Sequence, residues 1–138
     1  MENAMNNFEE VRAHVRAARE LKNDDPYLIT LELKLSDGRR QGIYLAELEA
    51  ESGGRYLRIS SPIAPLSKSN AERALRFNWA QRVGYFALND LDGEPYLHLC
   101  ENRPYGSLSG KEVDAVIREI GLLSDRLEQL ISNGQDLL

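Results

Sequence analysis

The chain has 138 residues, of which 42% are hydrophobic and 28% charged, a composition typical of a globular domain with one core and not of a disordered segment. No apolar run approaches the roughly 18 residues of a membrane-spanning helix, and residues 1–10 lack the basic and apolar regions of an export signal, so the sequence predicts a cytoplasmic protein without membrane insertion. The net charge is −5, and the 17 Lys and Arg residues are scattered among 22 acids, which argues against nucleic acid as a partner.

The first predicted element is an amphipathic helix over residues 7–22. Apolar residues recur every three or four positions along it, which is the spacing of a helix with one buried face. Asn7 is a favourable N-cap residue, and Glu10 stands where its side chain can complete a capping box. Pro26 then marks a break, because proline lacks the backbone donor that a helix needs.

Three strands are expected next. Residues 27–35 alternate apolar and polar side chains, which predicts a strand with one face on the core and one in water. The segments 36–38 and 52–54 both end in glycine and predict tight turns into strands over about residues 41–50 and 55–60. Strands joined by short turns form an antiparallel meander.

A second helix is predicted over residues 70–82, with Ser69 and Glu72 as its capping box. Its apolar residues cover roughly 200° of the helix surface, whereas a helix that packs on one core needs about 100°. Two interpretations remain open: the surplus side forms a homodimer contact, or the helix is sunk between the sheet and the loops. In the first interpretation the dimer interface contains the largest apolar residues of the helix, which are Leu75, Phe77 and Trp79.

A β-hairpin follows, with Asp92 and Gly93 at its turn. An Asp-Gly pair also occurs in calcium-binding loops, but Gly93 at the sixth position would place Leu88 and Leu99 at positions one and twelve, where oxygen ligands are required. The flanking segments are rich in β-branched and aromatic residues. An Asp-Gly pair between two such segments predicts a two-residue hairpin turn.

The last predicted element is a long helix that begins after its N-cap Ser109 and ends near residues 133–134. Its apolar residues follow a heptad seam, which fits either a coiled-coil partner or a helix lying on its own sheet. We favour the second interpretation because the seam lacks systematic flanking charges. Gly121 in the helix interior indicates either a close backbone approach or simple tolerance.

The order of these elements predicts the fold class. No linker or internal repeat divides the chain, so we expect a single domain over residues 1–138. It is predicted to be an α+β domain in which three helices pack on a five-stranded antiparallel sheet, in the order α-βββ-α-ββ-α.

No catalytic, metal-binding or cofactor-binding residue is predicted. The sequence contains two histidines and one cysteine, so no metal cluster of usual spacing can form. His98 and Cys100 lie two apart on a strand, about 6.5 Å from each other, which exceeds the hydrogen-bond distance that a Cys/His nucleophile requires. Packing is the favoured role for both residues, and an enzyme or small-ligand binder is the least favoured function.

Four of the six tyrosines are expected on the sheet face opposite the aliphatic one: Tyr44, Tyr56, Tyr85 and Tyr96. Tyrosine combines a large apolar ring with a hydrogen-bonding tip, and aromatic residues are enriched at interface cores. These residues are therefore candidates for binding a protein partner. The alternative is that cross-strand tyrosine pairs only stabilise the sheet.

The segment LRFNWAQRVGYFALNDLDGEPYLHL, residues 75–99, resembles the type III secretion chaperone-like superfamily, as do the order of elements and the capped last helix. This group includes class I effector chaperones of the Tir-chaperone type and YbjN-type domains. Its pattern is a helix ending in Leu-x-x-Asn, a strand pair with an Asp-Gly turn, and a last amphipathic helix. The matching positions are Leu75, Asn78, Phe86, Leu88, Asp92, Gly93 and Leu97.

The resemblance implies a small acidic cytoplasmic protein that forms a homodimer through its second helix and neighbouring strands. It also implies that the chain binds an extended segment of another protein without hydrolysing it. The leading hypothesis is a non-enzymatic, chaperone-like binding module of the type III secretion effector type. The alternative is a regulatory or stress-related YbjN-type domain that binds a folded partner, since the tyrosine-rich strands and the segment LLSDRLEQL resemble that branch equally well.

Overall fold

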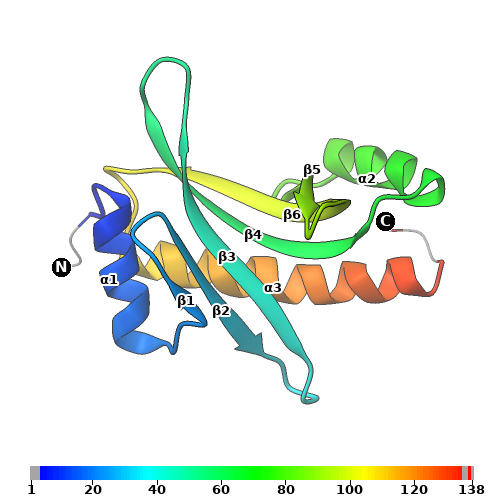
Figure 1. The fold of residues 1–138 in the computed structure, drawn as a ribbon, viewed down its shortest axis with the longest axis horizontal. Helices are drawn as coiled ribbons and strands as arrows, with labels where there is room; N and C mark the ends of the chain where they lie inside the picture. Colours follow the sequence, from blue (N-terminus) through cyan, green and yellow to red (C-terminus); the bar gives the residue numbers. More distant parts are fainter. Residues whose placement is uncertain (1–3, 135–136, 138) are drawn as a thin grey trace.

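The computed structural model describes residues 4–134 and residue 137 of the chain. Figure 1 shows a curved sheet with the longest helix, α3, running along it, α1 near the beginning of α3, and α2 beside the last two strands. The elements are α1 (Phe8–Ala18), β1 (Asn23–Asp24), β2 (Leu28–Lys34), β3 (Arg40–Glu49), β4 (Arg55–Pro65), α2 (Lys68–Ala80), β5 (Tyr85–Leu91), β6 (Glu94–Pro104) and α3 (Gly110–Ser132). The predicted α+β class with three helices is confirmed.

The sheet contains six antiparallel strands in the order β1-β2-β3-β4-β6-β5, one strand more than predicted. The additional strand is β1, in which Asn23 pairs with Thr30 and Asp24 with Ile29. Two polar residues carry no strand signal of their own. They pair because a tight turn, closed by backbone hydrogen bonds between Asp25 and Leu28, returns the chain against β2. The element order is therefore α-ββββ-α-ββ-α.

The strand β4 continues to Pro65, whereas the prediction ended it near residue 60. Its prolines favour departure from the sheet, but a β-bulge between Pro62 and Ala64 accommodates them while β4 stays paired with β6. A bulge of this kind depends on the neighbouring strand and leaves no local signal in the sequence.

The β5–β6 hairpin prediction is confirmed. Leu91 pairs with Glu94, which leaves Asp92 and Gly93 as the two turn residues. Their φ angles are 51° and 82°, and the favoured two-residue hairpin turn requires positive φ at both positions.

Two of the three predicted helix starts are confirmed. The side chain of Asn7 accepts a hydrogen bond from the backbone N–H of Glu10 at 2.9 Å. The hydroxyl of Ser109 accepts one from the backbone N–H of Glu112 at 3.1 Å. The first helix is shorter than predicted, because α1 ends at Ala18.

The predicted N-cap of α2, Ser69, is wrong. The N-cap is Ser67, whose hydroxyl accepts from the backbone N–H of Asn70, while the Asn70 side chain accepts from the backbone N–H of Ser67. The buried Asn70 side chain also donates a hydrogen bond to the carbonyl of Pro65 at 3.0 Å. This contact with the segment just before the helix selects Ser67, since it fixes Asn70 at the third helical position.

The helix α3 lies on its own sheet, as favoured over the coiled-coil interpretation. Its seam residues Val113, Val116 and Ile120 are buried. At Gly121, an added Cβ would overlap the side chain of Leu33 on β2, so the glycine permits a close approach of helix and sheet. Among the described residues, no helix is both long enough and apolar enough to cross a bilayer.

Candidate partner-binding surfaces

A row of side chains, including two of the predicted tyrosines, crosses the sheet on the face opposite α3. Tyr44 of β3 pairs with Thr30 of β2 and with Ser60 of β4. Cys100 of β6 pairs with Ser60 on one side and with Tyr85 of β5 on the other. Directly opposed residues of antiparallel strands point to the same face. Tyr44 and Tyr85 therefore share a face, although two strands, β4 and β6, lie between them.

Tyr56 and Tyr96 lie on this same face. Tyr56 is four residues before Ser60 on β4, and Tyr96 is four residues before Cys100 on β6, so strand alternation gives them the same direction. Tyr56 is 37% exposed, and the other three predicted tyrosines are half-buried. The structure thus places all four together on what we call the tyrosine face. Their role in binding a partner stays a prediction.

A cleft of about 400 Å³ opens on the tyrosine face. Strands β2 to β6 all contribute to its lining, through residues that include Leu28, Tyr44, Arg58, Ser60, His98 and Cys100. Apolar, hydroxyl and cationic groups therefore meet in one depression at the middle of the sheet.

His98 and Cys100 have the packing role that the sequence favoured. Both are buried, and the nearest hydrogen-bond partner of the Cys100 thiol is the backbone carbonyl of His98 at 3.9 Å. The His98 ring lies 3.2 Å from the carbonyl of Asn89. Burial raises the pKa of the Cys100 thiol to about 11 and lowers the pKa of His98. The thiol is therefore protonated at neutral pH, which leaves it a poor nucleophile.

One edge of the sheet is covered only in part. The carbonyl of Thr30 accepts a hydrogen bond from the N–H of Lys22, so even-numbered residues of β2 direct their backbone groups away from β3. The strand β1 pairs only with Ile29 and Thr30. Within residues 4–134, no hydrogen bond reaches the outward backbone groups of Glu32 and Lys34. The N–H and C=O groups of these two residues form an open segment of the sheet edge, which we call the β2 edge.

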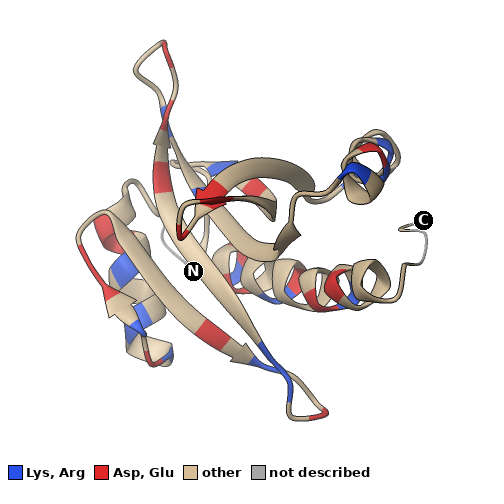
Figure 2. Cartoon of the chain, turned by 45° about the vertical axis from the view of Figure 1, so that its right-hand side comes forward, with Lys and Arg blue, Asp and Glu red and all other residues tan. Residues whose placement is uncertain are grey.

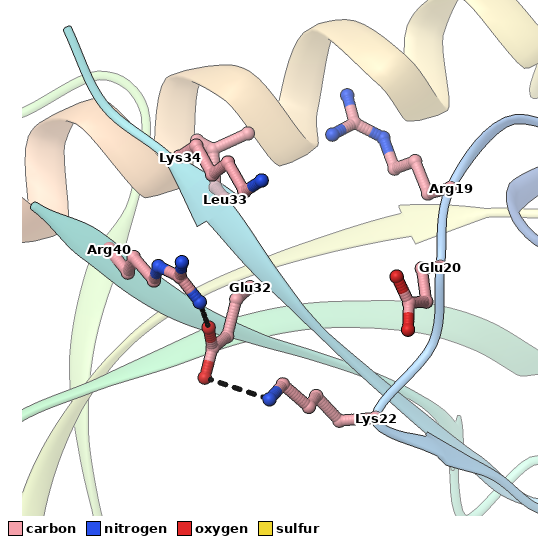
Figure 3. A pocket seen from close by; sticks show the side chains of 7 residues that line it. All are labelled: Arg19, Glu20, Lys22, Glu32, Leu33, Lys34 and Arg40. Atoms are coloured by element: carbon pink, nitrogen blue, oxygen red, sulfur yellow. Dashed lines mark hydrogen bonds and ion pairs between the residues drawn. The ribbon is translucent and has the colours of Figure 1, made fainter. Parts of the chain in front are cut away.

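A charged cleft of about 500 Å³ borders the β2 edge. Figure 3 shows the side chains of Arg19 and Glu20 on one side of it and those of Leu33 and Lys34 on the other. Its lining contains four basic and two acidic residues: Arg19, Lys22, Lys34, Arg40, Glu20 and Glu32. Figure 2 shows that basic and acidic residues are otherwise interspersed over most described elements.

Glu32 is the acidic centre of this cleft. Arg40 donates a hydrogen bond to it at 3.1 Å, and the ammonium group of Lys22 lies 3.5 Å from its other oxygen. The hydrogen bond from Arg40 lowers the pKa of Glu32 below its usual value. In the described part of the chain, Arg19 and Lys34 have no acidic partner. The cleft therefore keeps a surplus of unpaired positive charge.

The helix α2 is apolar on two sides. One side is exposed, as the homodimer interpretation requires, and the other is buried, as the interpretation of a helix sunk against the sheet requires. Leu75 and Trp79 are 70% and 94% exposed and line a shallow cleft of about 460 Å³. The predicted position of Phe77 on this outer surface is wrong. Phe77 is fully buried against Phe86, with ring centroids 5.1 Å apart in an edge-to-face arrangement.

Asn78 fixes α2 to the sheet. Its side-chain oxygen accepts a hydrogen bond from the N–H of Phe86 at 2.7 Å, and its amide donates to the carbonyl of Phe86 at 3.2 Å. This amide therefore takes the place of a neighbouring strand at one position of β5. The two hydrogen bonds thus join α2, which carries Trp79 on its outer surface, directly to β5.

Sequence reasoning did not identify two features of these surfaces. The β2 edge depends on where β1 stops, and β1 itself has no sequence signal. Arg58 on β4 resembles any polar residue of an alternating strand until cross-strand neighbours are known. The one signal available in the sequence was strand alternation, which places Arg58 on the same face as Tyr56.

Comparison with known proteins agrees with this architecture. No protein-family model matches the chain, and no curated protein matches it in sequence. A chain of the HopA1–SchA chaperone–effector complex matches with a TM-score of 0.56 and 12% identity, over 86% of this chain and 90% of that chain. YbjN, a candidate transcription regulator from E. coli, matches with a TM-score of 0.60 and 11% identity, over 92% of this chain and 93% of that chain. The chain thus has the fold found in both, which is the fold that its sequence resemblance to chaperone-like and YbjN-type domains predicts.

Proposed function

We propose that this chain is a chaperone-like, cytoplasmic protein-binding module that holds an extended segment of a partner protein. The observation that carries the proposal is the β2 edge, where the outward backbone groups of Glu32 and Lys34 lack a strand partner and both residues line a cleft. An extended segment can add to such an edge through main-chain hydrogen bonds, while pockets for alternate side chains select it. A secreted effector is the class of partner that the sequence resemblance implies, and the likeness to a chain of a chaperone–effector complex supports it.

The charge of the cleft favours an acidic segment. Four basic residues line it in a protein whose net charge is −5, and Arg19 and Lys34 are available to a ligand. Complementary charge accelerates encounter and disfavours wrong partners more than it adds affinity. We therefore expect Asp or Glu beside the central residues of a bound segment.

Selection from a display library of short random segments tests this proposal. Immobilised protein is expected to enrich segments that alternate apolar residues and that compete with one another for one site. An unrelated protein of similar size and net charge is the matched control. If no segment binds this chain better than the control protein, the proposal is wrong.

The tyrosine face is proposed as the surface against which the held segment packs. Replacing Tyr56 or Tyr96 with Ala should each weaken binding of a selected segment by more than about 1 kcal/mol, the usual threshold for an anchor residue. Calorimetric titration measures this loss, and thermal melting should be almost unchanged. Tyr27→Ala, which removes an 81% exposed tyrosine outside this face, is the control. Unchanged affinity with lowered stability would show that these rings serve only the sheet.

We also propose a homodimer through the outer surface of α2, formed by Leu75 and Trp79. A twofold contact pairs one patch with itself, so a single substitution acts twice. Trp79→Asp is expected to convert the dimer to a folded monomer in light scattering, because it places two carboxylates in one apolar contact. Ala17→Asp on the exposed side of α1 should leave the dimer intact. A monomeric wild-type protein would contradict the proposal.

A further inference from the structure

Arg58 is a half-buried cation in the middle of the tyrosine face. It lies on β4 between Ala46 of β3 and Asn102 of β6, and neither neighbour carries an acid. Within residues 4–134, its guanidinium takes part in no hydrogen bond or ion pair. Arg55 and Arg103, on the same two central strands, pair with Glu47 and with Glu101. Arg58 therefore differs from its neighbours in lacking a counter-ion.

The titratable groups that interact electrostatically with Arg58 are neutral at pH 7. They are Tyr85, His98 and Cys100, all on the tyrosine face. Among the residues that line the cleft, the one carboxylate is Asp90 at the far end of β5, and no ion pair joins it to Arg58. A partly desolvated cation without an opposite charge is costly unless a ligand supplies that charge.

Further hydrogen-bond donors surround Arg58. The hydroxyls of Tyr44 and Ser60 line the same cleft, and these two residues face each other across β3 and β4. In the described residues, neither hydroxyl has a hydrogen-bond partner. A carboxylate can accept two parallel bonds from a guanidinium and still accept from a hydroxyl. Leu28 and Ala46 supply an apolar wall for the methylene groups of an acidic side chain.

We propose that the cleft around Arg58 binds the carboxylate of one Asp or Glu side chain of the held partner segment. The inference rests on the proposed function and adds a position-specific requirement to it. The unpaired charge of Arg58 calls for an anion, and the open strand face and apolar wall suit a side chain presented by an extended chain. Asp25 already occupies the outer edge beside Leu28, so a segment held at the β2 edge reaches this cleft by continuing across the tyrosine face.

Parallel selections with the wild-type protein and with Arg58→Gln test the inference, using the same display library of short random segments. Wild-type protein should enrich Asp or Glu at one fixed position, and Arg58→Gln should lose that preference while keeping the remaining pattern. For a synthetic segment from the wild-type selection, Arg58→Gln and replacement of the acidic residue by its amide should each weaken binding about tenfold, and the two changes together no further. Arg118→Gln, on the exposed surface of α3, is the control.

The outcomes separate this inference from the function on which it rests. If segments bind but no fixed acidic position appears, or if it persists with Arg58→Gln, the inference is wrong and the proposed function stands. If no segment binds at all, both fail. Arg58→Lys keeps the charge but not the paired donors, so it should retain the acidic preference with reduced affinity. Thermal melting of each variant shows that the fold is intact.

Discussion

Phe77→Ala is expected to lower the free energy of unfolding by about 3–5 kcal/mol, the usual cost of truncating a fully buried phenylalanine. The ring is completely enclosed and packs edge-to-face on Phe86. Its removal therefore loses apolar burial, leaves a cavity and breaks an aromatic pair that joins α2 to β5. Chemical denaturation, followed by circular dichroism, measures the loss.

Trp79→Ala is the matched control, since it removes an even larger aromatic ring from the same helix. The ring is 94% exposed, so the change in unfolding free energy of the single chain should stay within about 0.5 kcal/mol. Both variants need measurement at several protein concentrations, because any contribution from self-association depends on concentration and folding of one chain does not. Equal losses in the two variants would mean that α2 is not docked through Phe77.

Glu32→Pro is expected to weaken segment binding strongly while the protein stays folded. The N–H of Glu32 points away from β3 and serves no hydrogen bond within residues 4–134, so proline removes a donor that the fold does not use. The proline ring occupies the space where an added strand would pair. We expect binding of a selected segment to weaken about a hundredfold, which corresponds to about 2.7 kcal/mol.

Glu32→Ala separates the backbone effect from the loss of the carboxylate. Both variants remove the interactions of Glu32 with Arg40 and Lys22, but only proline removes the donor and blocks the edge. If Glu32→Pro binds the segment with wild-type affinity, the segment does not pair with the β2 edge. That result would also favour the alternative of a regulatory domain that recognises a folded partner, because such recognition does not need a free strand edge.

The parts of the fold that were predictable from sequence are those specified by residues close together in the chain. The alternation in β2, the Asp92-Gly93 turn and the N-caps Asn7 and Ser109 each depend on a few neighbouring residues. The face of the tyrosines was predictable for the same reason, since strand alternation is a local property.

Most of the remaining features depend on contacts between distant segments. The N-cap of α2 is an exception: Ser67 caps it instead of Ser69 because Asn70 reaches Pro65, five residues before it. A helical wheel shows that Phe77 and Trp79 lie at the two ends of a broad apolar arc, but it does not show which end meets a sheet. The isolation of Arg58 is visible only once the neighbours of β4 are known, because an absent counter-ion is a property of the assembled face.

The division of α2 into an inner side with Phe77 and an outer side with Trp79 has an evolutionary consequence. Exposed positions away from the core tolerate substitution with little effect on stability. A lineage with this fold can therefore acquire, lose or exchange partners at Leu75 and Trp79 while Phe77 and Asn78 continue to hold the helix in place. Different residues of α2 therefore determine its packing on the sheet and the surface that it offers to partners. Proteins of this architecture can diverge in oligomeric state faster than in shape.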